Sequence, residues 1–300
     1  MRIRLDGHLG DPDVLAAIAP SLDSDAAEAD AGSIAQIDFH EASHGRERVP
    51  GEVAEWTGRM PSIALVREAA PDVMRHYGST LPPGGITSIL RRAQARLRAR
   101  EDGGTDGRVE VLEHERLHEA FYAVDSVRLR HSSYDGGLSE PLQRYVFVSF
   151  DAVIVLPYDS ATDRVLVVEQ FRMGPFGRGS SNPWMAEPVA GLVDPGEDPE
   201  TTAIREAEEE AGLRIRELIG IGGGYTSPGA STGYHHHYIG LCHIPDEVRT
   251  GGEETEGEDI RAIPMTADAL FARLDAGTMR NVPLMLCTLA LRERRAALRA

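Results

Sequence analysis

The sequence predicts a mixed α/β protein in two parts, a sandwich of helices and strands over residues 105–300 and a smaller N-terminal α+β domain over residues 1–104. The chain of 300 residues is long enough for two modest domains. Short β-branched runs mix with helical patterns throughout the second part. The stretch 101–107, Glu-Asp-Gly-Gly-Thr-Asp-Gly, has the composition of a linker between the parts.

The second part contains eight segments with strand character, because each is rich in apolar and β-branched residues. These segments are residues 108–113, 121–130, 143–156, 165–170, 186–193, 214–222, 234–241 and 258–264. Helical patterns cover residues 266–274 and 282–300, and the second ends in Arg-rich turns that suit a helix C-terminus.

A further helix begins after Asp198, which has the properties of an N-cap, and ends at Gly212. Glu206, Glu209 and Glu210 lie three or four residues apart, so a helix places them on one face. Like charges at this spacing repel by roughly 0.2–0.5 kcal/mol per pair. The crowded carboxylates therefore predict a bound hard cation with oxygen ligands, Mg²⁺ above all. The competing interpretation is a solvated Glu-rich surface.

Eight positions around this helix follow the pattern G-x5-E-x7-R-E-U-x-E-E-x-G-U, in which U is apolar. They are Gly191, Glu197, Arg205, Glu206, Glu209, Glu210, Gly212 and Leu213, with Ala207 as a small occupant of the first apolar position. The pattern resembles the Nudix box, the diagnostic loop-helix-loop of the Nudix hydrolases. Eight specified residues at fixed spacing favour this interpretation over a solvated surface.

The resemblance extends over residues 108–300 to the ADP-ribose pyrophosphatase branch of that family. The segments that carry it are residues 168–172, 183–190, 227–231 and 256–261, and Pro228 stands where the branch has a proline. The resemblance implies a Nudix α/β/α sandwich. It also implies a pyrophosphohydrolase that uses Mg²⁺, with Mn²⁺ as a substitute, and cleaves ADP-ribose to AMP and ribose 5-phosphate.

The resemblance also implies the roles of individual residues. The implied metal ligands are the backbone carbonyl of Ala190 and the side chains of Glu206, Glu210 and Glu258. Glu209 holds a second ion or the metal-bound water. Arg205 pairs with Glu197 to fix the loop. A general base must deprotonate the attacking water, and Glu256 occupies that position. The residues alone do not separate Glu256 from Glu253 and Glu254.

Three residues resemble substrate contacts of the branch. Arg144 and Arg172 match phosphate-binding positions, and guanidinium groups suit phosphate oxygens. Phe121 matches a position that stacks on adenine, although an aromatic residue in a strand more often belongs to the core. In this branch a partner subunit can supply such residues, which implies a homodimer. Gly233 replaces a Glu that the branch often carries, so the preference for ADP-ribose over other substrates stays open.

Three alternatives follow. The first is the same chemistry on GDP-mannose or another nucleoside diphosphate sugar. The second is a non-catalytic nucleotide-sugar sensor, for which degenerate box glutamates would be the usual mark. The third is a cyclotransferase, because residues 6–9 resemble the start of gamma-glutamylcyclotransferase-like domains. Asp6 and His8 depart from that motif, so residues 1–104 are expected to form a degenerate accessory domain.

The formal net charge of −17 argues against nucleic acid or an anionic membrane surface as a partner. No apolar leader or membrane-length run stands out, so a cytoplasmic location is expected. Cys242 and Cys287 form neither a disulfide framework nor a zinc pattern. In the run 235–237 only His235 and His237 could share one face of a strand, so this run is interpreted as structural.

Overall fold

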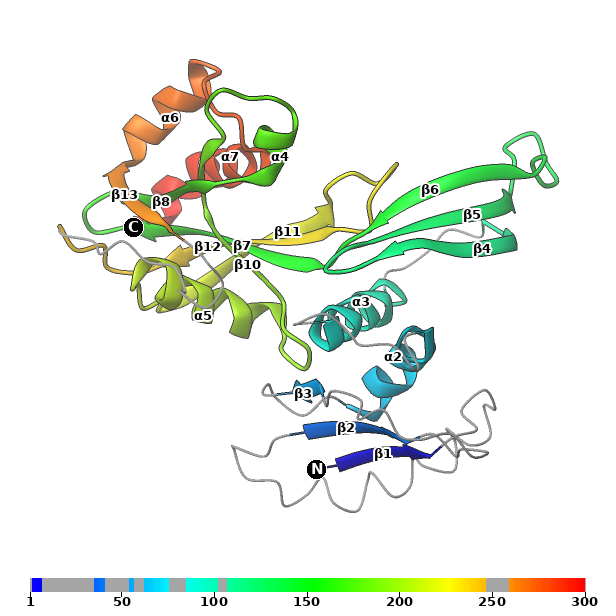
Figure 1. The fold of residues 1–300 in the computed structure, drawn as a ribbon. Helices are drawn as coiled ribbons and strands as arrows, with labels where there is room; N and C mark the ends of the chain where they lie inside the picture. The colour runs from blue at the N-terminus through cyan, green and yellow to red at the C-terminus, as the bar shows by residue number, and fades with distance from the viewer. Residues whose placement is uncertain are drawn as a thin grey trace. The chain divides into compact units, whose positions relative to one another are not determined.

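The computed structural model describes residues 2–6, 35–40, 54–56, 62–75, 85–101, 107–246 and 259–299. The chain divides into two compact units (Figure 1). The first unit comprises residues 1–150, 194–197 and 227–232, and the second comprises residues 151–193, 198–226 and 233–300.

The second unit is built on a seven-stranded mixed sheet. Its main path runs in the order β11 (Glu217–Tyr225), β12 (Tyr234–Leu241), β7 (Asp151–Asp159), β8 (Arg164–Phe171) and β13 (Arg261–Thr266). Off this path, β10 (Val189–Leu192) pairs with β7, and β9 (Trp184–Glu187) pairs with β8. Strands β12 and β7 are parallel, and the remaining pairs of this sheet are antiparallel.

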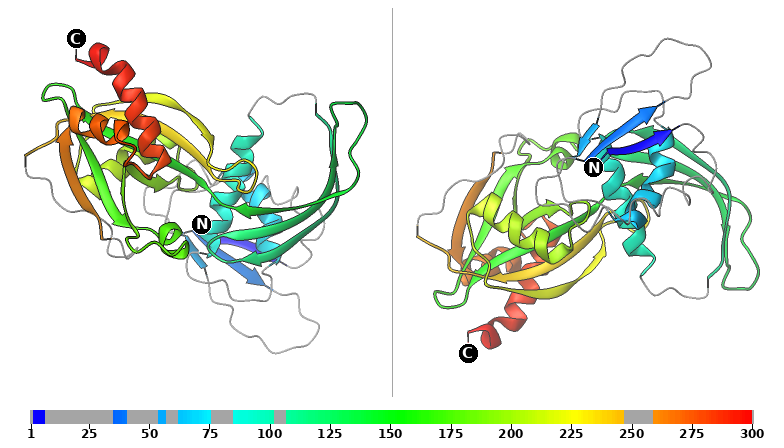
Figure 2. Two further views of the ribbon diagram at one scale, coloured as in Figure 1. Left: turned by 90° about the horizontal axis from the view of Figure 1, so that it is seen from above. Right: turned by 90° about the horizontal axis from the view of Figure 1, so that it is seen from below.

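Helices cover both faces of this sheet (Figures 1 and 2). Helix α5 (Pro199–Ala211) packs its buried alanines on a core that includes Val153 and Val155 of β7. Helices α6 (Ala267–Asp275) and α7 (Val282–Leu298) pack on a second core that includes Ile154 and Leu156. Successive residues of a strand point to opposite faces, so β7 serves both cores. The α/β/α sandwich is confirmed.

Local signals in the sequence set the ends of these helices. The Asp198 carboxylate accepts a hydrogen bond from the Thr201 amide at 2.8 Å and caps α5. At the other end Gly212 has a φ of 62°, a left-handed conformation that glycine adopts without steric cost. Thr266 and Asn281 cap α6 and α7 in the same way as Asp198 caps α5. The short helix α4 (Met173–Gly177) was not predicted.

The described residues of the first unit form two three-stranded sheets and two helices. One sheet is antiparallel, in the order β4 (Val109–Glu119), β5 (Ala123–His131) and β6 (Leu142–Val148). The other has the order β1 (Arg2–Asp6), β2 (Ala35–His40) and β3 (Ala54–Trp56). Helices α2 (Ile63–Arg75) and α3 (Gly85–Ala99) pack together through an apolar cluster that includes Leu65, Ile89 and Leu90. The described residues before 105 thus combine helices with strands, as expected of an α+β domain.

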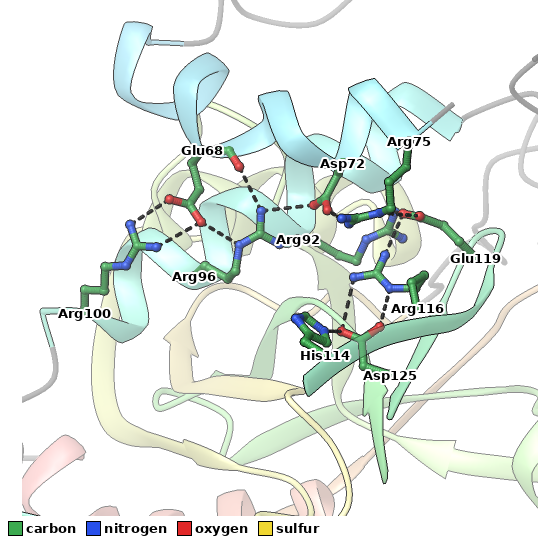
Figure 3. A network of polar contacts seen from close by, with 10 residues as sticks. All are labelled: Glu68, Asp72, Arg75, Arg92, Arg96, Arg100, His114, Arg116, Glu119 and Asp125. Atoms are coloured by element: carbon green, nitrogen blue, oxygen red, sulfur yellow. Dashed lines mark hydrogen bonds and ion pairs between the residues drawn. The ribbon is translucent and has the colours of Figure 1, made fainter. Parts of the chain in front are cut away.

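An ion-pair network joins α2 and α3 to strands β4 and β5 within the first unit (Figure 3). We call it the charged network. Its members are Glu68, Asp72, Arg75, Arg92, Arg96, Arg100, His114, Arg116, Glu119 and Asp125. Burial alone would raise the pKa of the Asp125 carboxyl, but hydrogen bonds from Arg116 and His114 lower it below its usual range. The network therefore carries charged carboxylates at neutral pH.

Several strand predictions were wrong in their limits. The segment 186–193 is not one strand, because β9 pairs with β8 whereas β10 pairs with β7. The segment 143–156 is not one strand, because β6 pairs with β5 in the first unit whereas β7 belongs to the sheet of the second. Phe121 does not begin a strand but lies in the turn between β4 and β5. Most of the cyclotransferase-like motif and of the predicted linker, residues 7–9 and 102–106, lies outside the described residues. In the described part of the chain, no helix has the length and apolar character needed to cross a membrane.

Candidate active site

Two carboxylates of α5 lie against the backbone of strand β10. The Glu210 side chain is buried, and its Oε2 accepts a hydrogen bond from the Ala190 amide at 3.2 Å. One turn earlier, the Glu206 carboxylate lies where a side chain at Gly191 would be, because a Cβ built there would lie 1.9 Å from Glu206 Oε1. A larger residue at position 191 would therefore displace the Glu206 carboxylate from this place. Two glutamates four residues apart on α5 thus lie against two successive residues of the strand.

Arg205 supplies the positive charge beside these groups. Its Nη1 atom lies 2.9 Å from Glu206 Oε1 and 2.7 Å from Glu209 Oε2. The guanidinium thus offsets part of the repulsion that the helix spacing creates. The pairing of Arg205 with Glu197 that the sequence predicted stays a prediction.

The donor set suits a hard divalent cation. Glu206, Glu210 and the backbone of Ala190 meet at one place in the second unit, and carboxylate and carbonyl oxygens are the ligands that Mg²⁺ and Mn²⁺ take. Glu256 and Glu258, the other two acidic candidates, lie outside the described residues. Within the described ranges no group of three or more His, Cys, Asp or Glu side chains is arranged around a metal position.

The loop between β10 and α5 belongs to the first unit and is held by α3. Residues 194–197 receive side-chain contacts from Arg91, Gln94 and Arg98. The sequence analysis missed these three residues. Their spacing of three and four marks one face of a helix, which is a signal that could have indicated α3, but nothing in the sequence indicated which loop this face contacts.

The predicted substrate residues lie in both units. Phe121 is 48% exposed and packs edge-on against Phe150, with ring centroids 5.2 Å apart, so its ring is not a core residue. Arg144 is exposed and donates to the Gln143 carbonyl. Both belong to the first unit. In the second unit Arg172 donates from Nε and Nη2 to the buried carboxylate of Glu187, at 3.0 Å and 2.9 Å to its Oε2.

Pro228 lies in a turn over residues 227–230 that is closed by hydrogen bonds from Ala230 and Ser231 to the Ser227 carbonyl. Gly233 is buried, and its carbonyl accepts a hydrogen bond from the Thr226 amide at 2.9 Å. The backbone of Gly233 therefore helps to close the loop between β11 and β12. Glycine has no side chain to take the place of the glutamate that the branch often carries at this position.

The three histidines of β12 divide between the two faces of the strand. Burial, followed by the neighbouring His237 and His236, lowers the pKa of His235 to about 4. Burial also lowers the pKa of His237, whose Nδ1 lies 3.3 Å from the Gly222 carbonyl oxygen. His235 and His237 are therefore neutral at pH 7. His236 faces the other way, with Nε2 3.5 Å from Asp151 Oδ2.

Comparison with known proteins identifies the family of this chain. A model of the NUDIX domain matches residues 148–283. The ADP-ribose pyrophosphatase of Escherichia coli K12 is 31% identical over 173 residues, which are 58% of this chain and 82% of that protein. The ADP-ribose pyrophosphatase of Haemophilus influenzae is 30% identical over 175 residues, 58% of this chain and 81% of that protein.

A second group of relatives is named for another substrate, GDP-mannose. The GDP-mannose pyrophosphatase of Cronobacter sakazakii is 26% identical over 178 residues, 59% of this chain and 92% of that protein. Among solved structures, the crystal structure of an ADP compounds hydrolase shares the fold with a TM-score of 0.50 and 17% identity, covering 66% of this chain and all of that one. The chain therefore belongs to the NUDIX family, in the branch of the ADP-ribose pyrophosphatases.

Proposed function

We propose that this protein hydrolyses the pyrophosphate bond of a nucleoside diphosphate sugar, with ADP-ribose as the foremost candidate and a divalent cation as cofactor. The observation that carries the proposal is the placement of the Glu206 and Glu210 carboxylates on the backbone of Gly191 and Ala190. The names of the relatives support the substrate class, since they are pyrophosphatases of ADP-ribose or GDP-mannose.

In the proposed reaction water adds to one phosphorus, and the bond from that phosphorus to the bridging oxygen breaks, so ADP-ribose yields AMP and ribose 5-phosphate. A divalent ion, when bound, neutralises the pyrophosphate charge and lowers the pKa of a bound water. Glu206, Glu210 and the Ala190 carbonyl would hold it. Glu209 would orient the water or a second ion, and Glu256 would accept the proton.

We propose phosphate contacts for Arg172 and Arg144, and a stacking contact with the base for Phe121. The Glu187 carboxylate fixes the Arg172 guanidinium through two donors, and a guanidinium held in one orientation suits the binding of phosphate oxygens. The Phe121 residue is 48% exposed, so its ring is accessible to a base. Mg²⁺ is the proposed ion, with Mn²⁺ as a substitute, because both accept oxygen ligands.

We also propose a homodimer and a cytoplasmic location. Large apolar side chains stand exposed on the sheet β4–β6, among them Val109 (61%), Val111 (60%) and Tyr145 (63%). An exposed apolar sheet surface of this kind is suited to contact with a second copy of the chain. Neither proposal bears on the chemistry at Glu206 and Glu210.

Hydrolysis of GDP-mannose is the second candidate, favoured by the GDP-mannose pyrophosphatases among the relatives and by Gly233, where a branch-typical glutamate is replaced. The sensor alternative is disfavoured because all box glutamates are intact. The test is turnover of a panel of nucleoside diphosphate sugars with Mg²⁺, with products identified by chromatography. AMP and ribose 5-phosphate from ADP-ribose support the first candidate. GMP from GDP-mannose at a higher kcat/KM supports the second, and binding without turnover supports a sensor.

A further inference from the structure

We propose that helix α3, which precedes the region matched to the family, is a positioning element of the active site. Within the first unit this helix contacts two segments that adjoin or carry residues of the proposed function. One is the loop 194–197, which runs directly into α5. The other is the turn 120–122, which carries Phe121. The proposal rests on the proposed function for the roles of these segments, while the contacts stand on the structure alone.

Gln94 binds the loop 194–197 through both ends of its amide. Its Oε1 accepts a hydrogen bond from the Gly196 amide at 2.7 Å, and its Nε2 donates to the Glu197 carbonyl at 2.9 Å. Arg98 Nη2 donates to the same carbonyl at 2.6 Å. These bonds hold the backbone of a turn in which Gly196 has a positive φ of 86°. The backbone at the entry to α5 is thus specified by side chains of α3.

Arg91 adds an ion pair to the same loop. Its Nη2 lies 2.5 Å from Asp194 Oδ1, and its Nε lies 3.2 Å from the same oxygen. Residues 91, 94 and 98 follow the i, i+3, i+7 spacing that places side chains on one helix face. Three side chains of one face of α3 therefore contact the loop along its length. The residue after the loop is Asp198, the N-cap of the helix that carries Glu206 and Glu210.

Arg92 of α3 binds the backbone of the turn 120–122, which carries Phe121. Its side chain is only 1% exposed, and Nη1 donates to the Phe121 carbonyl at 3.2 Å. Nη2 pairs with the Glu119 carboxylate at the end of β4. Burial lowers the pKa of Arg92 to about 10, so the guanidinium is still charged at neutral pH. The Phe121 backbone is therefore fixed while its ring stays exposed.

The charged network anchors α3 to α2, so the helix that holds both segments is itself fixed (Figure 3). Arg96 pairs with Glu68 at 2.6 Å and with Asp72 at 3.0 Å, and Arg100 pairs with Glu68 at 2.6 Å. These contacts lie on the α2 side and touch neither loop. Side chains locked in this way by packing and ion pairs are the usual support of a preorganised site.

The test separates contact with the loop from general stability. Gln94→Met keeps the side-chain length and removes both hydrogen bonds, whereas Arg100→Gln weakens only the pairing of α3 with α2. Because small misplacement of reacting groups can cost on the order of 100-fold in rate, we expect Gln94→Met to lower kcat about 10- to 100-fold with KM nearly unchanged. We expect Arg100→Gln to leave kcat within about twofold of the wild type.

Amide hydrogen exchange provides a readout that does not depend on activity. Gln94→Met should speed exchange of the Gly196 amide, since its acceptor is lost, and Arg100→Gln should not. Equal exchange at Gly196 in wild type and Gln94→Met would overturn the proposal, as would an unchanged kcat. If the wild type turns over no nucleoside diphosphate sugar, the proposed function fails, while faster exchange at Gly196 still supports the contact.

Arg92→Lys tests the second segment. Lysine keeps the charge beside Glu119 but lacks the fork that reaches the Phe121 carbonyl. We expect KM for the nucleotide substrate to rise about 10-fold with a smaller change in kcat, the reverse of Gln94→Met. A KM equal to that of the wild type, with Glu119 exchange and melting temperature unchanged, would contradict the role of Arg92.

Discussion

The Glu206 carboxylate occupies the space that a side chain at residue 191 would fill, since a Cβ built on Gly191 lies 1.9 Å from Glu206 Oε1. Gly191→Ala should therefore move Glu206 off strand β10. We expect kcat to fall about 10- to 100-fold, the range found when supports of a metal site are removed. Titration of Mg²⁺ against activity should show weaker binding. Gly220→Ala is a control in the same unit, because a Cβ there meets nothing within 4 Å. Equal losses in the two variants would show that the contact with Glu206 is unimportant.

Glu256→Gln tests the assignment of the general base. An amide cannot accept the proton from water, so we expect kcat to fall by about 10²–10⁴ while the Mg²⁺ dependence stays near that of the wild type. Glu253→Gln and Glu254→Gln are matched controls from the same segment. A larger loss in either control would move the base to that residue. A loss confined to Mg²⁺ affinity in Glu256→Gln would make Glu256 a ligand.

The charged network should contribute strongly to the stability of the first unit. The Glu119 side chain is 8% exposed and receives Arg92, Arg116 at 2.8 Å and Arg75 at 3.7 Å. Glu119→Gln leaves three guanidinium groups short of a carboxylate, and breaking a buried pair costs about 3–5 kcal/mol. Chemical denaturation should show this loss in the free energy of unfolding.

An exposed ion pair provides the comparison for Glu119→Gln. Asp275 and Arg292 lie 2.7 Å apart with side chains 67% and 42% exposed, so Asp275→Asn should cost no more than about 1 kcal/mol. Similar losses in Glu119→Gln and Asp275→Asn would mean that burial does not strengthen the network.

His235 of β12 should make stability depend on pH. The pKa of His235 is about 4 in the folded protein against 6.5 as its ordinary value, so between these values the unfolded chain binds more protons at this site. Stability from His235 is therefore complete above pH 6.5 and is lost as the pH falls towards 4. His235→Gln should flatten this part of the melting temperature profile. Parallel profiles for wild type and variant across pH 4–6.5 would contradict a neutral His235 in the folded protein.

Local signals explain which parts of the fold were predictable. The limits of α5 follow from Asp198, Pro199 and Gly212, each of which acts through its own backbone conformation, and the prediction is confirmed. The break between β6 and β7 was missed, because residues on both sides of Ser149 and Phe150 favour strands equally. Which sheet each strand joins depends on distant partners.

The residues of the candidate site also divide into those that local sequence patterns predicted and those that depend on distant contacts. Glu206 and Glu210 were identified from helix spacing, and the structure places both side chains against β10, while their role as metal ligands stays a prediction. The contribution of α3 was not predicted, because Gln94 and Arg92 act on segments about 100 and 30 residues away in sequence, and a helical pattern carries no information on distant partners. The roles of Glu256 and Glu258 stay predictions.

The most direct measurement is the Mg²⁺-dependent turnover of ADP-ribose by Glu210→Gln beside Glu208→Gln. Glu210 is buried against Ala190, whereas Glu208 is exposed on the same helix two residues away, so both variants remove one charge from α5. We predict that Glu210→Gln loses at least about 100-fold in kcat with the fold intact, and that Glu208→Gln keeps the wild-type rate. Undiminished turnover by Glu210→Gln would contradict the metal site on which the account depends.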